Sequence, residues 1–406
     1  MNNRSFKLVG VALVAASLAF TGCGSRTDAS AGGGAGGATK VAKIGVVAPL
    51  SGGLSALGLG IRNSVDLAIR QANDSNAIPG WKLELAAEDD EAKPDVGKNA
   101  ATKLAGDDAV IGVVGALNSS VSQSVTPVLQ SARIVQVSPA NTGPSLTQGA
   151  DFATAPARPN DNFFRTCTTD TIQGGVAAQY LLDSGIKKIA TIHDKKIYGQ
   201  GLVNSVTENF KKGGGEVVAA ETINPDDSDF GTVITKVAKA QPEVVYYGGE
   251  YPQAGPLSKQ MKAAGLKVPL MGGDGIFDGT YIKLAGDASE GDFATSVGEP
   301  VDTSASAKAF IDAYGKAGFA EPYAAYGAQS YDAANAIINA LKESLKTATD
   351  AKSAREATIK AMAAVSFTGA TGKVAFDKYG DTVTKIVTVY KVSGGKWATE
   401  KTIDQS

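Results

Sequence analysis

The sequence predicts an α/β protein with two lobes, each built on a parallel sheet that helices cover on both faces. Short apolar runs of strand character alternate with longer stretches of helical period along most of the chain. Such alternation is typical of βαβ units, which build parallel sheets. The units occur as two series in tandem, so we expect two three-layer lobes. A length of 406 residues is sufficient for two domains of ordinary size.

The first series of strands and helices is predicted between residues 43 and 139. The run "AVIGVV" (109–114) is apolar throughout, as expected for a strand that is buried on both faces. Pro94 stands where it can open a helix, because proline is well tolerated in the first helical turn. Strands and helices are expected in turn at 43–50, 60–74, 81–89, 94–108, 109–115, 119–132 and 133–139.

The second series begins near residue 171, and a helical and hairpin-like tail follows it. The helix that starts near Tyr198 should end at the glycines 213–215, since glycine is favoured after a helix C-terminus. The last segment, 385–403, has the pattern of a hairpin that turns at Gly394 and Gly395. The expected elements are 171–185, 187–194, 198–215, 216–223, 230–241, 243–250, 256–265, 267–274, 304–318, 324–345 and the hairpin.

The N-terminal segment has the pattern of a secretory signal. Arg4 and Lys7 precede an apolar run that is too short to span a bilayer comfortably, and the run ends at "FTGC" with Cys23. This ending resembles a bacterial lipobox, although Phe20 stands in place of the usual leucine. We therefore expect a signal peptide at 1–22, a lipidated Cys23 and a Gly/Ala/Ser-rich tether at 23–42. The alternative is a plain signal peptide that is cleaved near an unmodified cysteine.

Composition and motifs argue against several functions. Lys and Arg number 39 against 41 Asp and Glu, so no charge excess favours nucleic acid. We found none of the common nucleophile, phosphate-loop or zinc-protease motifs. Cys167 lacks a partner for a disulfide or a zinc site, so we expect it to be a small buried residue. His193 is the only histidine, and no serine or cysteine stands near it, which disfavours a catalytic role. We expect neither an enzyme nor a bound cofactor or metal.

An acidic segment, "AEDDEAKPD" (87–95), follows a predicted strand. Carboxylates at this density can bind a metal ion, but a charged strand end is more often simply solvated. We expect a solvated strand end.

Polar segments follow the strands and indicate a binding site. Ligands of open α/β sheets bind beyond the carboxyl ends of the strands, where helix N-termini offer free N–H groups. These segments are rich in Gly, Ser, Thr, Asn and Tyr, with isolated acids at Glu250 and Asp274. Hydroxyl and N–H groups suit a carboxylate, and an isolated acid suits an ammonium, so the inventory favours a zwitterion. The segments are 49–53, 116–123, 138–147, 193–201, 246–255 and 271–279.

Several of these segments resemble the leucine/isoleucine/valine-binding proteins, the extracellular receptors of branched-chain amino acid ABC transporters. The resemblance rests on "HDKKIYGQGL", "VVYYGGEYPQAG", "AAGLKVPLMGGDG" and "SPANTGPSLT", and it extends from Lys43 to the final hairpin. It implies a type I periplasmic-binding-protein fold in which three crossovers, near residues 169, 297 and 379, join the lobes. The lobes would then comprise 43–169 with 298–378, and 170–297 with 379–406.

The resemblance also implies the residues of the pocket. Ser119 and Thr142 would hold the ligand carboxylate, with help from backbone groups at Ala140 and Asn141. Asp274 would bind the ammonium, and Tyr198 would cover the ligand from the second lobe. His193 would then be a structural residue beside the cleft.

Two positions depart from the family pattern. Leu57 stands where the family often has a first-lobe tyrosine, so we expect an apolar wall there. Glu250 stands where a tyrosine commonly follows "YYGG". Glu250 could point to solvent, bind a basic side chain, or mark a different ligand.

These features predict a monomeric, lipid-anchored binding protein outside the cytoplasm. Its ligand would be leucine, isoleucine, valine or a related aliphatic amino acid, and its partner an ABC transporter permease. The same fold could instead bind an amide, a small carboxylate or a polar amino acid. It could also serve as a ligand sensor without transport.

Overall fold

The computed structural model describes residues 39–406. The predicted signal peptide, Cys23 and most of the predicted tether lie outside this range. None of the helices within it combines the length and the apolar character needed to cross a membrane.

The first sheet contains five parallel strands in the order β2-β1-β3-β4-β5. All six residues of β3 are buried, which confirms the prediction of a strand covered on both faces. The strands are β1 (Lys40–Ala48), β2 (Trp81–Asp89), β3 (Val110–Gly115), β4 (Val135–Ser138) and β5 (Phe163–Arg165). Strand β1 starts three residues before its predicted beginning, because Lys40 to Ala42 pair with Trp81 to Leu83 of β2. These three residues therefore belong to the sheet and not to a tether.

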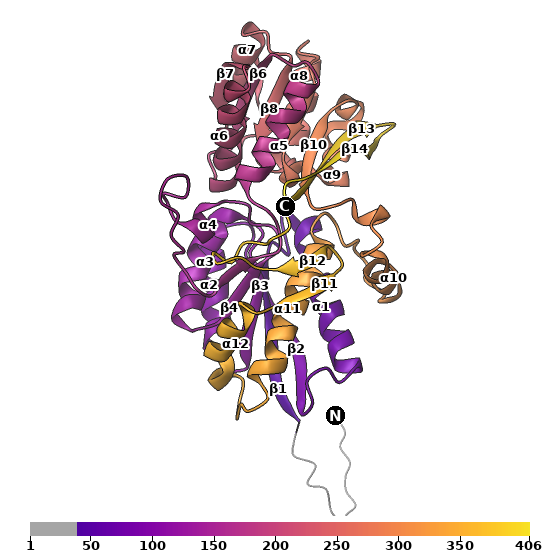
Figure 1. Cartoon of the computed structure of the whole chain (residues 1–406). Helices are drawn as coiled ribbons and strands as arrows, with labels where there is room; N and C mark the ends of the chain where they lie inside the picture. Colours follow the sequence, from indigo (N-terminus) through magenta and orange to yellow (C-terminus); the bar gives the residue numbers. More distant parts are fainter. Residues whose placement is uncertain (1–38) are drawn as a thin grey trace, which may run out of the picture. The chain divides into compact units, whose positions relative to one another are not determined.

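Helices from both ends of the described chain cover the first sheet. Helix α11, far along the sequence, packs on α1 and on strands β3 and β4, and Figure 1 shows α11 and α12 among the N-terminal strands. Pro94 is the first residue of α2, as predicted. The helices are α1 (Ser55–Asp74), α2 (Pro94–Gly106), α3 (Ser119–Ser131), α4 (Ser145–Gln148), α11 (Gly327–Ser344) and α12 (Arg355–Met362).

The second sheet contains seven strands in the order β14-β13-β10-β9-β8-β6-β7. Strands β6 to β10 are parallel, and the C-terminal hairpin β13–β14 joins antiparallel beside β10 (Figure 1). The hairpin turns at Gly394 and Gly395, both with positive φ, as predicted. The strands are β6 (Lys188–His193), β7 (Glu216–Thr222), β8 (Val244–Gly248), β9 (Leu270–Gly272), β10 (Phe293–Val297), β13 (Ile386–Ser393) and β14 (Lys396–Asp404).

The remaining elements flank the second sheet, lie beside elements of the first sheet or connect the two. Helix α6 ends at Lys212, directly before the predicted glycine stop. The helices are α5 (Asp170–Asp183), α6 (Ile197–Lys212), α7 (Gly231–Lys239), α8 (Tyr251–Ala263), α9 (Gly279–Ala285) and α10 (Lys308–Lys316). Short 3₁₀ helices are η1 (Asp274–Ile276), η2 (Gly286–Ser289), η3 (Val301–Thr303) and η4 (Lys352–Ala354), and a separate hairpin pairs β11 (Ser366–Gly369) with β12 (Gly372–Ala375).

The chain passes between the two sheets three times. These passages lie between β5 and α5, between β10 and α11, and between β12 and β13. The α/β fold with two parallel-dominated lobes is thus as predicted from the sequence. The predicted residue boundaries of the lobes stay a prediction.

The acidic segment after β2 differs from its prediction. Asp90 is fully buried and accepts a hydrogen bond from the Ala92 N–H at 2.8 Å. Burial raises the pKa of Asp90 to about 7. The expected solvated strand end is therefore wrong for this residue. No group of three or more His, Cys, Asp or Glu side chains in residues 39–406 is placed to hold a metal ion.

Candidate functional site

A small cavity lies where the ends of strands from both sheets meet. Its lining residues are Leu117, Asn118, Ser119, Ala140, Tyr198, Glu250, Asp274, Gly275 and Tyr326. The centre of a water-sized sphere can occupy only about 10 Å³ of it, which is room for about one water molecule. Both lobes contribute, because the residues follow β3 and β4 of the first sheet and β6, β8 and β9 of the second.

The structure brings together part of the predicted site. Ser119, Ala140, Tyr198, Glu250 and Asp274 all line this cavity. The other three predicted residues, Leu57, Asn141 and Thr142, do not line it.

Each of these three residues has a different environment. Leu57 is 1% exposed and belongs to the hydrophobic core, so the expected apolar wall of the pocket is not formed by its side chain. The Asn141 side chain donates to the Leu117 carbonyl oxygen at 2.7 Å and so holds the loop after β3. Thr142 is fully buried, and its carbonyl oxygen accepts from the backbone N–H of Asp170 at the start of α5.

Neutral hydrogen bonds hold the first-lobe side of the cavity. The Ser138 hydroxyl donates to the Ala116 carbonyl oxygen at 2.8 Å and accepts from the Asn141 N–H at 2.9 Å. Ser119 is the first residue of α3, where free N–H groups and the helix dipole favour an anion. This side can therefore receive a carboxylate without supplying a charged side chain.

Asp274 is the charged centre of the second-lobe side. It is 1% exposed, and its Oδ1 accepts from Gln173 Nε2 and from the Tyr198 hydroxyl, each at 2.8 Å. The Tyr326 hydroxyl donates to Oδ2 at 2.8 Å. Burial raises the pKa of Asp274, while these three donors lower it. A buried carboxylate with only neutral partners is a suitable acceptor for an ammonium group.

Sequence reasoning missed Tyr326. It directly precedes α11 and therefore reaches the cavity from the first lobe, after the chain has returned from the second sheet. Its segment has ordinary helical periodicity, and an aromatic residue at a helix start carries no distinct signal. The order of the strands would have been needed to place this residue at the same edge as Asp274.

Glu250 is not at a solvent-exposed rim. It is 3% exposed, and its carboxylate lies 2.5 Å from Lys196 Nζ. Lys196 Nζ also lies 3.2 Å from the Asp194 carboxylate. Burial and the nearby Glu250 raise the pKa of Asp194 to about 7. The alternative in which Glu250 points to solvent is therefore wrong. The Lys196 ammonium partly neutralises the charge of the Glu250 carboxylate.

Glu250 also connects the lobes. Its Oε1 accepts from Asn118 Nδ2 of the first lobe at 2.7 Å. A second bond, from the Ile197 N–H to the Ser120 hydroxyl at 3.2 Å, joins the segment after β6 to the segment after β3. The loops after β3 and β6 are thus linked next to the cavity.

The side chains of His193 and Cys167 each take part in one hydrogen bond with a described residue. The His193 Nδ1 accepts from the Lys195 N–H at 3.1 Å, and burial lowers the pKa of this half-buried imidazole. Cys167 is 1% exposed and unpaired, and its thiol donates to the Asn141 carbonyl oxygen. Burial raises the pKa of the thiol, which keeps it protonated and unreactive. Cys167 is the small buried residue that was predicted.

Comparisons with known proteins show the family of this chain. Residues 41–396 match the model of the periplasmic binding protein family. The chain is 30% identical over 354 residues to the Leu/Ile/Val-binding protein BraC3 of Rhizobium johnstonii, a match that covers 87% of this chain and 92% of that protein.

Solved structures are also similar. One is a leucine binding protein, LivK, from Thermotoga maritima, with 26% identity, a TM-score of 0.79, and coverage of 90% of this chain and 99% of that chain. Another is the branched-chain amino acid transporter substrate binding protein LivJ from Streptococcus pneumoniae in complex with isoleucine. It has 27% identity, a TM-score of 0.78, and coverage of 90% of this chain and all of that chain.

Proposed function

The chain belongs to the periplasmic binding protein family, among the Leu/Ile/Val-binding proteins, and on this basis we propose that it captures a branched-chain or related aliphatic amino acid between its lobes. It then delivers the amino acid to an ABC transporter permease. The protein acts outside the cytoplasm and holds its ligand without transforming it.

The buried Asp274 carboxylate carries this proposal. Its three donors are all neutral, so no cation in residues 39–406 pairs directly with this carboxylate. The ligand ammonium would supply the missing positive charge. The ligand carboxylate would then lie toward Ser119 at the N-terminus of α3, on the opposite side of the cavity. Two of the similar solved structures support this assignment: one is a leucine binding protein, and the other is a complex with isoleucine.

The small size of the cavity implies movement of the lobes. An amino acid needs much more space than one water molecule, so it can enter only if the loops after β3 and β6 separate. Closure by a hinge between two lobes would follow binding. Solution scattering should then show a smaller radius of gyration with ligand than without it.

A thermal-shift screen of the twenty amino acids tests the assignment. A ligand that binds only the native state stabilises it by roughly 2.7 kcal/mol at about a hundredfold excess over Kd. Leucine, isoleucine and valine should raise the melting temperature, and D-leucine serves as the stereochemical control. The amino acid assignment fails if none of the twenty produces a shift.

A second candidate keeps the fold and changes the ligand to a more polar amino acid. The observation that favours it is Glu250, which lines the cavity although the family commonly has a tyrosine there. Its carboxylate is shared between Lys196 and Asn118, so it could also accept a donor from a ligand side chain. Larger shifts with glutamine, serine or threonine than with leucine would support this candidate.

Anchoring through a lipid on Cys23 completes the proposal. The lipobox-like "FTGC" and the Gly/Ala-rich segment that follows support it. Metabolic labelling with a fatty acid should mark the wild type and leave Cys23→Ala unmarked. Equal absence of label, with both proteins in the medium, would contradict lipidation.

A further inference from the structure

A second and much larger cavity lies apart from the predicted amino acid site. It has a volume of about 560 Å³, within the range of about 300–1,000 Å³ that is usual for small-molecule pockets. Its walls come from the start of α1, the segment after η1, the end of β10, the segments 299–303 and 322–325, and the hairpin β13–β14. None of the residues predicted to bind the amino acid lines it.

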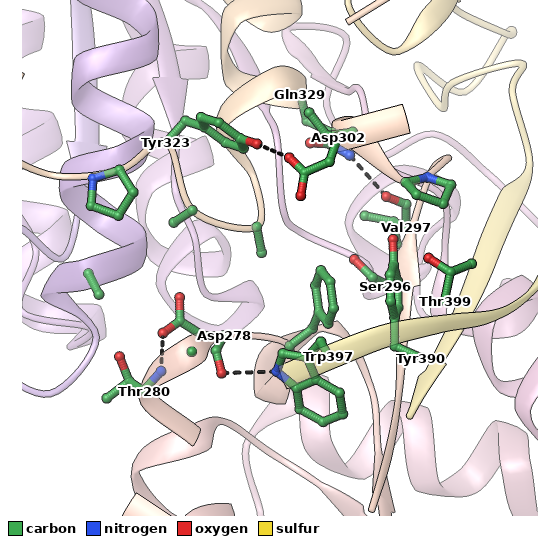
Figure 2. A pocket seen from close by; sticks show the side chains of 18 of the residues that line it. Asp278, Thr280, Ser296, Val297, Asp302, Tyr323, Gln329, Tyr390, Trp397 and Thr399 are labelled. Atoms are coloured by element: carbon green, nitrogen blue, oxygen red, sulfur yellow. Dashed lines mark hydrogen bonds between the residues drawn. The ribbon is translucent and has the colours of Figure 1, made fainter. Parts of the chain in front are cut away.

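Aromatic side chains form one wall of this cavity (Figure 2). Phe277 stacks on Tyr390 with ring centroids 4.0 Å apart, and Trp397 lies 5.7 Å from Phe277. The Trp397 indole N–H donates to the Asp278 carbonyl oxygen at 3.1 Å, which fixes the ring. Tyr323 contributes a fourth ring from the opposite segment. Such rings bind apolar bodies, and their faces attract cations.

The charged groups of the cavity are mainly acidic. Asp278, Glu299 and Asp302 line it, whereas Lys283 is the one basic lining residue within the described part of the chain. The three carboxylates accept from neutral donors, namely the Thr280 N–H, the Ser304 hydroxyl and the Tyr323 hydroxyl. Lys283, Glu299 and Asp302 are exposed, and Asp278 is half-buried, so the three carboxylates outnumber the one ammonium without a difference in exposure that favours either sign. The local charge therefore favours a cation.

Gln329 links α11 to the end of β10 at the wall of the cavity. This lining residue is 3% exposed, and its Nε2 donates to the Val297 carbonyl oxygen at 2.9 Å (Figure 2). That bond fixes the orientation of the amide, and Oε1 has no hydrogen-bond partner in residues 39–406. This oxygen has less than 1 Å² of accessible surface, so a ligand in the cavity does not contact it.

We propose that this cavity is a second ligand site that takes a small organic cation, an ammonium group on an apolar or aromatic body. The ammonium lies beside Asp302, and the apolar body lies against Phe277, Tyr390 and Trp397. This site is separate from the site of amino acid capture.

Trp397 provides a direct readout, because the chain has only two tryptophans. In a Trp81→Phe background, Trp397 is the sole indole, and its fluorescence is titrated with the phenethylammonium ion near pH 7. The neutral probe is 2-phenylethanol, which has the same ring and no charge. Asp302→Asn tests the cavity, and Asp226→Asn, which removes an exposed charge outside the cavity lining, is the matched control.

We expect saturable quenching by phenethylammonium, about fivefold weaker binding of 2-phenylethanol, and a similar loss of affinity for the cation in Asp302→Asn but not in Asp226→Asn. Leucine at high concentration should not displace the cation. Equal binding of both probes, no response to either, or displacement of the cation by leucine would each overturn the proposal. Because the readout is Trp397, failure of leucine binding itself would not affect this result.

Discussion

The two sides of the strand-end cavity differ in how they are built. The first-lobe side, around Ser119 and Ala140, uses neutral hydrogen bonds that close within the lobe, such as those of Ser138 and Asn141. The second-lobe side contains the buried carboxylates of Asp274 and Glu250. Each of these carboxylates takes one of its donors from the first lobe, through Tyr326 and Asn118 respectively.

This difference indicates which part of the site depends on closure. A neutral loop that satisfies its own hydrogen bonds can keep its shape when the lobes separate. A buried carboxylate that loses a donor on separation becomes less stable unless water or a ligand replaces that donor. The second-lobe side is therefore the side whose stability is coupled to the ligand and to the other lobe.

The largest expected effect comes from removing Lys196, whose ammonium pairs with two buried carboxylates of the second-lobe side. Lys196→Met leaves Asp194 and Glu250 buried without their shared positive partner. Breaking a buried pair in this way typically costs about 3–5 kcal/mol of unfolding free energy. Urea unfolding near pH 8 measures this loss of unfolding free energy. The matched control is Lys195→Met, at an exposed neighbour, which should change stability by no more than about 0.5 kcal/mol. Similar losses in both variants would show that the charged cluster is not stabilised by Lys196.

The next largest effect concerns affinity and Asp274. Asp274→Asn keeps the shape and removes the charge, and it should weaken binding of the best amino acid by about 2–5 kcal/mol. Tyr326→Phe removes only one donor to the same carboxylate, so we expect a smaller loss of about 1.5–3 kcal/mol. Calorimetric titration measures both, and Asp287→Asn, at an exposed position, is the control for a lost surface charge. A silent Asp274→Asn would remove the charge argument for the ligand.

The sequence predicted the fold more fully than the site. Strands such as β2 and β3 were predicted almost to the residue, because their apolar patterns are local. Strand β10 was missed, since "FATSV" is short and half polar. Asp274 and Tyr198 were placed by the likeness of their segments to a family.

The environments of single residues in the site depend on contacts between distant segments. Tyr326 reaches Asp274 across 52 positions, and Asn118 reaches Glu250 across 132, so no local pattern encodes these bonds. The same reason explains why Glu250 was considered for a solvent-facing position although it is buried. Leu57 was expected in the pocket, but its helix turns it into the core.

The pH dependence of stability should distinguish a buried aspartate that has hydrogen-bond donors from one that lacks them. Asp170, at the start of α5, is 1% exposed, and neither of its carboxylate oxygens has a hydrogen-bond partner among residues 39–406. Burial raises the pKa of Asp170 to about 8; the nearby Thr142 hydroxyl lowers it, although its geometry falls short of a hydrogen bond.

The sign of the effect follows from proton linkage. Between its unfolded pKa of about 4 and its folded pKa of about 8, the native state holds a proton that the unfolded state has lost, so stability falls as the pH rises. From about pH 6 to about pH 8 this fall should be about 2 kcal/mol. Asp170→Asn should remove this part of the slope in urea unfolding at several pH values. An unchanged slope would mean that Asp170 is ionised and compensated.

The smallest effect is expected on the neutral side. Ser119→Ala removes one hydroxyl from the cavity, and the only hydrogen bond that this hydroxyl makes with a described residue is a long one, from the Gly143 N–H at 3.4 Å. Unfolding free energy should therefore change little. Affinity for the amino acid should fall by about 0.5–1.5 kcal/mol, the usual value of one neutral hydrogen bond, because the free N–H groups at the start of α3 still face the ligand carboxylate.

Calorimetry on Ser119→Ala, Asp274→Asn and the double variant completes the comparison. If the two sides bind opposite ends of one zwitterion, they share a partner, so the loss in the double variant should differ from the sum of the single losses by about 0.5 kcal/mol or more. A loss from Ser119→Ala as large as that from Asp274→Asn would mean that the difference in charge between the two sides does not set the affinity.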